Sequence, residues 1–211
     1  MRIVLLGPPG AGKGTFAEQA SKTLGLPHIS TGDLFRAAIK NETDLGKKVK
    51  DILAQGLLVP DDLTIGLVRQ RLAEPDAQAG WILDGFPRTI PQAEALQDIS
   101  PVEMVLNLEV DDALILQRLT GRRICRNCGR IYHIVSMPPK KDGVCNVCGG
   151  ELYTRPDDQE SAIKTRLAAY REQTEPLVAW YNEKKLLVPL RGSGTPESVY
   201  SAFERILQNR G

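Results

Sequence analysis

A glycine-rich segment with one lysine is the first part of the chain whose residue types and spacing could do chemistry. It reads Gly7-Pro8-Pro9-Gly10-Ala11-Gly12-Lys13-Gly14-Thr15, follows an apolar run and precedes a segment that can be helical. Glycines let backbone N–H groups converge on phosphate oxygens, while the start of a helix adds partial positive charge and a lysine adds a full charge. The segment therefore predicts a phosphate-binding loop.

Four cysteines form a second group with a chemical spacing. Cys125 and Cys128 make one C-x-x-C pair, Cys145 and Cys148 make another, and 16 residues separate the pairs. This spacing is typical of a tetrahedral four-thiolate Zn²⁺ site, in which no water is left for the metal to activate, so we expect a structural metal. Fe²⁺ in the same ligand set and free thiols or two disulfides are the alternatives. A glycine follows each pair, where a tight turn favours positive φ.

The elements that position these groups alternate along the chain. Apolar runs predict strands at 2–6, 28–30, 81–84, 104–108 and 186–190. Helices are predicted at 15–24, 32–40, 44–55, 61–73, 111–120, 158–184 and 196–208. Such alternation predicts an α/β fold, with helices on both faces of a parallel sheet. The segment 121–158 interrupts the alternation and is rich in Gly, Cys, Pro and basic residues, so we interpret it as a small insert.

Several further segments carry a resemblance to a known family. They are Ser30-Thr31-Gly32-Asp33, Asp84-Gly85-Phe86-Pro87-Arg88, Gly121-Arg122-Arg123 and Arg155-Pro156-Asp157-Asp158. With the loop at 7–15, they resemble the nucleoside monophosphate kinases, and among these the adenylate kinase family, over residues 1–200. The resemblance implies a P-loop three-layer fold with a five-stranded parallel sheet. It also implies a core of residues 1–29, 60–120 and 159–211, an AMP-binding module at 30–59 and a zinc-binding lid at 121–158.

The reaction implied by the resemblance is ATP + AMP ⇌ 2 ADP, with Mg²⁺. Catalysis of such a transfer is mostly positioning and charge stabilisation, so the site needs fixed cations more than a nucleophile. The resemblance implies that Arg36 and Arg88 hold the AMP phosphate and that Arg122 lies on the ATP side. The other cations at matched positions are Lys13 in the loop, and Arg155 and Arg166, which would close on the transferred group. Arg118, one helical turn before Arg122, is expected to join them.

The family's remaining contacts are carried over to matching positions. ATP is expected at Gly10, Ala11, Gly12, Lys13, Gly14, Thr15, Arg122, Ile131, Tyr132 and Gly194. AMP is expected at Thr31, Arg36, Leu57, Leu58, Val59, Gly85, Phe86, Pro87, Arg88, Gln92, Arg155 and Arg166. An amide such as that of Gln92 can pair with an adenine edge through one donor and one acceptor.

The magnesium ion is expected to have few protein ligands. The hydroxyl that usually follows the loop lysine is displaced to Thr15, because Gly14 stands between them. Asp84 ends a predicted strand, where its carboxylate could hold Mg²⁺-bound water, or could instead cap the following turn. Since Mg²⁺ gives up water reluctantly, we expect the nucleotide phosphates and water to hold it.

Other functions fit the sequence less well. The nearest alternative is a UMP/CMP kinase or a GTP-using relative. Thr31, Gln92 and the long lid argue against this alternative. A GTPase or ATPase switch would have a hydroxyl directly after Lys13. A zinc-ribbon nucleic-acid module would suit the basic insert, but the net charge is +1 (27 Lys+Arg, 26 Asp+Glu) and aromatic residues make up only 5%. Because the sequence has no apolar run of about 20 residues and no signal segment, we expect a cytoplasmic protein without membrane partners. We also expect a monomer without nucleic-acid partners.

Overall fold

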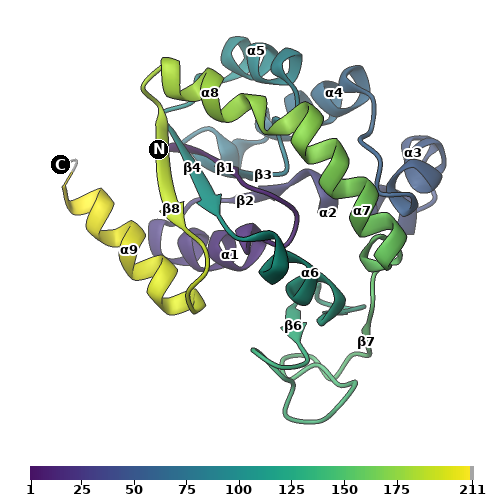
Figure 1. The fold of residues 1–211 in the computed structure, drawn as a ribbon. Helices are drawn as coiled ribbons and strands as arrows, with labels where there is room; N and C mark the ends of the chain where they lie inside the picture. Colours follow the sequence, from purple (N-terminus) through teal and green to yellow (C-terminus); the bar gives the residue numbers. More distant parts are fainter. Residues whose placement is uncertain (210–211) are drawn as a thin grey trace.

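The computed structural model describes residues 1–209, which contain two sheets (Figure 1). The larger sheet is parallel and has the strand order β2-β3-β1-β4-β8. Its strands are β1 (Arg2–Leu6), β2 (His28–Ser30), β3 (Trp81–Asp84), β4 (Met104–Glu109) and β8 (Leu187–Arg191). The smaller sheet is antiparallel, in the order β6-β5-β7, and consists of β5 (Arg122–Cys125), β6 (Ile131–His133) and β7 (Leu152–Tyr153).

Helices connect the strands of the parallel sheet. They are α1 (Lys13–Leu24), α2 (Thr31–Lys40), α3 (Asp44–Ala54), α4 (Asp61–Leu72), α5 (Ile90–Ile99), α6 (Asp112–Thr120), α7 (Glu160–Ala169), α8 (Pro176–Glu183) and α9 (Pro196–Gln208). Two short 3-10 helices, η1 (Pro75–Ala77) and η2 (Pro156–Asp158), and a π-helical segment, η3 (Tyr170–Thr174), complete the set. Within residues 1–209, no helix has both the length and the apolar character that crossing a membrane requires.

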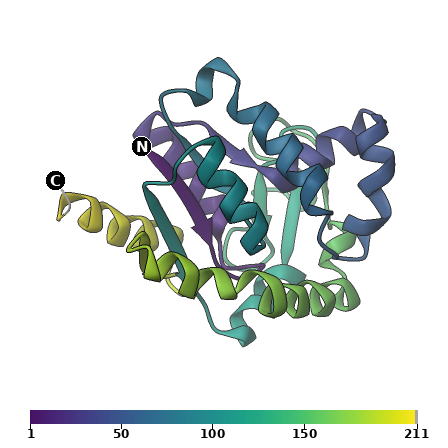
Figure 2. The same ribbon diagram turned by 90° about the horizontal axis from the view of Figure 1, so that it is seen from above.

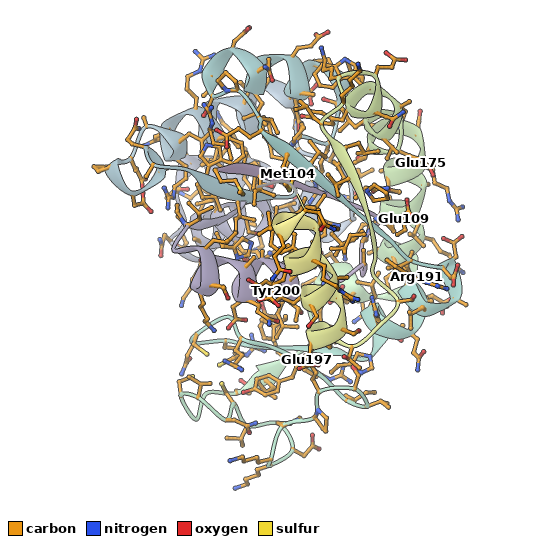
Figure 3. All side chains as sticks on the ribbon, turned by 90° about the vertical axis from the view of Figure 1, so that its left-hand side faces the viewer. Met104, Glu109, Glu175, Arg191, Glu197 and Tyr200 are labelled. Atoms are coloured by element: carbon orange, nitrogen blue, oxygen red, sulfur yellow. The ribbon has the colours of Figure 1, made fainter. Side chains whose placement is uncertain are left out.

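Alternate side chains of the sheet face two different layers of helices. Ile3 and Leu5 pack with α1 and α9, whereas Val4 and Leu6 pack with α4, α5 and α8. Figure 2 views the sheet from the side of α5 and α8, and Figure 3 views it from the side of α9, on which Tyr200 lies. Burial on both faces explains why the strands are almost wholly apolar. The predicted α/β fold with a five-stranded parallel sheet is confirmed.

The first helix begins earlier than predicted. It starts at Lys13 rather than Thr15, because Gly12 takes a left-handed conformation (φ 100°) and ends the loop there. The last residues of the phosphate-binding motif therefore lie in the first helical turn, where backbone N–H groups have no partner within the helix.

One helix was missing from the sequence prediction. Helix α5 begins after Thr89, whose side chain accepts a hydrogen bond from the Gln92 backbone N–H, and Pro91 lies in its first turn. A Thr-x-x-Gln sequence and an early proline are both signals for a helix start. These signals stand directly after the Asp84–Arg88 motif and could have revealed the helix.

The long helix predicted over 158–184 is interrupted. In place of one helix, α7 is followed by the π-helical turn η3 and then by α8. Pro176 has no N–H to continue an α-helical ladder, and the Glu175 N–H reaches back five residues to the Tyr170 carbonyl, at 2.8 Å.

Candidate active site

The glycine-rich segment lies at the carboxyl end of β1 and leads into α1. Gly7 has φ 132°, and a Cβ added there would lie 2.6 Å from the Leu108 carbonyl oxygen, so a larger residue does not fit. The Lys13 ammonium group folds back on the loop and donates to the carbonyls of Gly7, at 2.6 Å, and Pro8, at 2.9 Å. The loop therefore has the strand, turn and helix start that the phosphate-binding motif requires.

Asp84 ends the strand next to β1. In the parallel register Leu5 is opposite Asp84, so the carboxylate stands beside the glycine-rich loop. The side chain of His28, on the neighbouring strand β2, faces this carboxylate, with its Nε2 3.8 Å from Asp84 Oδ2. Burial alone would raise the pKa of Asp84, but His28, Lys13 and Arg88 hold it below its usual value. The group is therefore a carboxylate at the edge of the site.

A cavity of about 740 Å³ opens between the loop, Asp84 and the lid. Its lining includes all six predicted cations: Lys13, Arg36, Arg88, Arg122, Arg155 and Arg166. It also includes all ten residues predicted for ATP, namely Gly10, Ala11, Gly12, Lys13, Gly14, Thr15, Arg122, Ile131, Tyr132 and Gly194. The structure thus brings these side chains to one place from segments far apart in sequence, and their individual roles stay predictions.

Burial, and to a smaller extent the neighbouring cations, lowers the pKa values of three of these cations. Burial lowers the pKa of Lys13 to about 8, with Arg88, Arg166 and Arg122 adding to the effect and Asp84 opposing it. Burial lowers the pKa of Arg88 to about 10, and Arg166 adds to this. Burial and the nearby Arg36 likewise lower the pKa of Arg155 to about 10. A region with so much unbalanced positive charge suits a ligand with several negative charges.

A smaller cavity of about 30 Å³ adjoins the larger one between α2, α4 and α5. Most of the remaining residues predicted for AMP line one cavity or both: Thr31, Leu57, Leu58, Val59, Gly85, Pro87 and Gln92. The Gly85 carbonyl accepts from the Thr31 hydroxyl at 2.8 Å and from Arg88 Nε at 2.9 Å. Phe86 differs from its neighbours, because its ring is fully buried in the core and lines neither cavity.

Two acidic residues of η2 position Arg122, at the start of β5, and Arg166, in α7. The fully buried Asp158 carboxylate accepts from Arg122 Nε at 2.8 Å and Nη2 at 2.5 Å, and from Arg166 Nη1 at 3.0 Å. Asp157 Oδ2 lies 3.1 Å from Arg166 Nη1. Both acids belong to the Arg155–Asp158 motif, but no role was predicted for them from the sequence. Their part here is to orient two guanidinium groups toward the cavity.

Arg155 has donors still available. Its Nε is buried without a hydrogen-bond partner in the described chain, and its Nη2 lies 3.6 Å from Asp33 Oδ1. Asp33 Oδ1 also accepts from Arg36 Nη2 at 2.5 Å, so one exposed carboxylate stands between two predicted phosphate-binding arginines. Buried polar groups nearly always have partners, so the Arg155 Nε–H is a donor that a phosphate oxygen could use.

Arg118 borders the larger cavity together with the six predicted cations, and its guanidinium group also contacts the backbone of two segments. Its guanidinium group donates to the carbonyls of Ala11, at 3.1 Å, and Gly192, at 2.8 Å. It therefore ties the glycine-rich loop to the turn after β8, although it also borders the larger cavity. The guanidinium group of Arg118 therefore bonds to backbone carbonyls, whereas those of Arg122 and Arg166 also pair with the Asp158 carboxylate.

The four cysteines converge in the lid, where their Sγ atoms all lie within 4.8 Å of one another. The Sγ atoms of Cys125 and Cys148 are 3.4 Å apart, and those of Cys128 and Cys145 are 3.6 Å apart. Sulfurs at about 2.3 Å from a tetrahedral Zn²⁺ are about 3.8 Å apart, so the cluster fits a four-thiolate metal ion. The glycine after each pair has positive φ, at 73° and 69°, as predicted.

The lid contacts the loop through β6. A Cβ added at Gly14 would lie 3.4 Å from Ile131 Cδ1, so this side chain stands directly over the start of α1. Tyr132 is buried, and its hydroxyl accepts from the Asn146 N–H at 2.8 Å and lies 3.4 Å from Cys145 Sγ. Tyr132 therefore supports the second cysteine pair as well as bordering the cavity.

Comparison with known proteins decides the family. The family model described as adenylate kinase matches residues 5–186. The chain belongs to the adenylate kinase family. It is 52% identical to the adenylate kinase of Treponema denticola over 204 residues, which cover 97% of this chain and 98% of that protein. It is 51% identical to that of Caldicellulosiruptor bescii and 50% identical to that of Bacillus licheniformis, in each case over 100% of this chain and 99% of the relative. The predicted family is confirmed.

One further residue near the smaller cavity of this adenylate kinase family member, Asp61, was not predicted from the sequence. Asp61, at the start of α4, accepts hydrogen bonds from the Gln92 side-chain amide at 2.7 Å and the Thr89 hydroxyl at 2.9 Å. In the first turn of a helix an acidic residue is expected for its interaction with the helix dipole. The sequence therefore gave no reason to connect Asp61 with a nucleotide site.

Proposed function

We propose that the chain transfers the terminal phosphoryl group of ATP to AMP, reversibly, to give two molecules of ADP. As a member of the adenylate kinase family, the chain is a phosphotransferase. The observation that carries the assignment of the site is the convergence of Lys13 and five arginines on one cavity beside the glycine-rich loop. Two polyanionic substrates can approach each other only where fixed cations offset their repulsion.

The two nucleotides occupy different parts of this region. Residues 10–15 cradle the phosphates of ATP, with Lys13 and Arg122 beside them. Arg36 and Arg88 hold the AMP phosphate, and the adenine of AMP lies toward the smaller cavity. A phosphate oxygen of AMP attacks the γ-phosphorus while the bond from that phosphorus to the β–γ bridging oxygen breaks. Arg155 and Arg166 stabilise the charge on the transferred group, and ADP leaves on each side.

Two metals complete the proposal. Mg²⁺ bound with ATP neutralises part of the phosphate charge, and Asp84 is the carboxylate that would hold its water shell. The donor set of Cys125, Cys128, Cys145 and Cys148 would hold Zn²⁺, which supplies structure to the lid. Division of the chain into a core, an AMP-binding module at 30–59 and a lid at 121–158 is part of the same proposal.

A panel of nucleoside monophosphates tests the proposal directly. A coupled assay with ATP and AMP, UMP, CMP or GMP should give fast turnover with AMP alone. Arg88→Ala should raise KM for AMP at least tenfold more than KM for ATP, because Arg88 belongs to the AMP phosphate site. Preference for UMP or CMP would replace the assignment with the nearest alternative, and equal effects on both nucleotides would show that Arg88 has another role.

The cytoplasmic location, the monomeric state and the lack of nucleic-acid partners stay predictions. Sedimentation with and without nucleotides tests the monomer. A titration with single- and double-stranded nucleic acid tests whether nucleic-acid partners are absent. This test is needed because the lid carries several basic residues. Binding at physiological salt would give this basic lid a second function.

A further inference from the structure

The Gln92 side chain is held by two partners of opposite kind. Its Oε1 accepts from the Arg88 backbone N–H at 2.8 Å, and its Nε2 donates to Asp61 Oδ1 at 2.7 Å. The side chain is buried, and it lines the smaller cavity beside Thr31 and Leu58. While both contacts are made, the amide is held in one orientation.

The chemistry of the two partners fixes which end of the amide is which. A backbone N–H can only donate, so it requires the amide oxygen, and a carboxylate can only accept, so it requires the NH₂ group. A rotation of the amide by half a turn would oppose two donors at Arg88 and two acceptors at Asp61. Each mismatch leaves a buried group without a partner, which is unfavourable.

The contacts also determine what remains for a ligand. A primary amide has two N–H donors and two oxygen lone pairs, and one of each is already used. One donor and one acceptor remain, in an order set by Asp61 and Arg88. Adenine carries an amine donor and a ring-nitrogen acceptor on one edge, which complements this pair. Hypoxanthine, with nearly the same shape, carries a carbonyl acceptor and a ring N–H donor in the opposite order.

We propose that Asp61 is a positioning residue for base selection, which orients the Gln92 amide so that the site accepts adenine and rejects bases with the reversed edge. The inference rests on the proposed function, because it assigns the base of AMP to the smaller cavity. Asp61 touches no nucleotide in this proposal and acts only through Gln92. Its second contact, with the Thr89 hydroxyl, holds the residue that caps α5, and so fixes the backbone from which Gln92 projects.

Kinetics with AMP and IMP test the proposal. Asp61→Ala should lower the ratio of kcat/KM for AMP to that for IMP about tenfold, mostly through KM for AMP, with KM for ATP unchanged. The matched control is Asp62→Ala, which removes an exposed acid from the same helical turn and should leave the ratio unchanged. Thr89→Ala removes the cap of α5 and one partner of Asp61 but keeps the Asp61–Gln92 contact, so it should lower stability and should change the ratio less than Asp61→Ala does.

A second measurement follows the contact itself in the free enzyme. The side-chain NH₂ signals of Gln92, assigned by their loss in Gln92→Glu, should exchange slowly in wild type and quickly in Asp61→Ala. Equal losses of AMP and IMP activity in Asp61→Ala, or a ratio changed as much by Asp62→Ala, would overturn the proposal. So would fast exchange of the Gln92 amide in wild type. If the NMP panel showed no transfer to AMP, the proposed function would fail, and the exchange result would still report the contact.

Discussion

At the scale of single residues, Lys13 carries a charge that the protein alone does not balance. Burial and three arginines lower the pKa of Lys13 to about 8, and Asp84 offsets only part of this. Its ammonium group donates to two loop carbonyls, which are neutral and do not offset its charge, and it has a third N–H for another acceptor. Phosphates bring negative charge close to the lysine and should raise its pKa again.

ATP binding should therefore be coupled to proton uptake above pH 8. Free Lys13 is mostly neutral at pH 9 and becomes charged in the complex, so about one proton should be taken up per nucleotide at pH 9 and about a quarter of a proton at pH 7.5. Affinity for ATP should accordingly fall as the pH rises from 8 to 10. Calorimetry in two buffers of different ionisation enthalpy measures the uptake.

Lys13→Arg is the control for this coupling. A guanidinium group keeps its charge at pH 9, so the variant should bind ATP without the extra proton. Uptake that persists in Lys13→Arg would assign the proton to another group, and wild-type binding without uptake at pH 9 would contradict the lowered pKa.

Prediction of site residues from the sequence depends on residue types that match the chemistry of the ligand, and the individual roles stay predictions. Lysine and arginine in phosphate motifs point to phosphate directly, and the structure gathers the predicted cations around one cavity. It failed for Asp61 and Asp158, because an acidic residue in a helical turn resembles an ordinary surface charge. Only the folded chain shows that these acids hold Gln92, Arg122 and Arg166 in place.

At the scale of elements, η2 joins the lid to α7 and positions two arginines through one buried carboxylate. Asp158→Asn should remove the charge opposite Arg122 and Arg166, lower the free energy of unfolding by about 2–3 kcal/mol and reduce kcat at least tenfold. The stability effect is below that of a fully enclosed ion pair, because both guanidinium groups line the cavity. Thermal unfolding and steady-state kinetics measure the two effects.

Glu160→Gln provides the comparison for η2. Glu160 is exposed at the start of α7 and pairs with Lys164 at 2.9 Å, so Glu160→Gln should leave both the stability and kcat almost unchanged. If Asp158→Asn behaved like Glu160→Gln, the buried carboxylate would have no role in orienting the arginines.

The elements also show where local sequence patterns stop being informative. The parallel strands were predicted because burial on both faces leaves a nearly continuous apolar run. The strands of the lid have two to four residues each, too few for a periodic pattern. The π-helical turn η3 depends on a tertiary contact as well as on Pro176, since it brings the Thr174 hydroxyl within 2.9 Å of the Arg88 carbonyl.

At the scale of the whole molecule, the core and the lid are stabilised by different means. The parallel sheet buries apolar side chains on both faces, against helices from opposite sides. The buried cluster of the lid consists of Cys125, Tyr132, Cys145 and Leu152, and two of these four are cysteines of the proposed metal site. Because so small a cluster cannot offset the chain entropy of a segment of this length, we expect the lid to fold only with the proposed metal bound.

Removal of the metal should therefore unfold the lid before the core. Metal analysis should find about one Zn²⁺ per chain, with Zn–S distances of about 2.3 Å by X-ray absorption. A chelator, or Cys128→Ser, should make the amides of 125–148 exchange rapidly while those of β1 and β4 stay protected. Val147→Ser lies between the two cysteines of the other pair and is exposed, so it keeps all four sulfurs and should leave exchange unchanged. Metal-free protein with four freely titrating thiols and an equally protected lid would contradict the zinc site. The proposed phosphoryl transfer would not be affected by that result, because no step of the transfer uses the zinc.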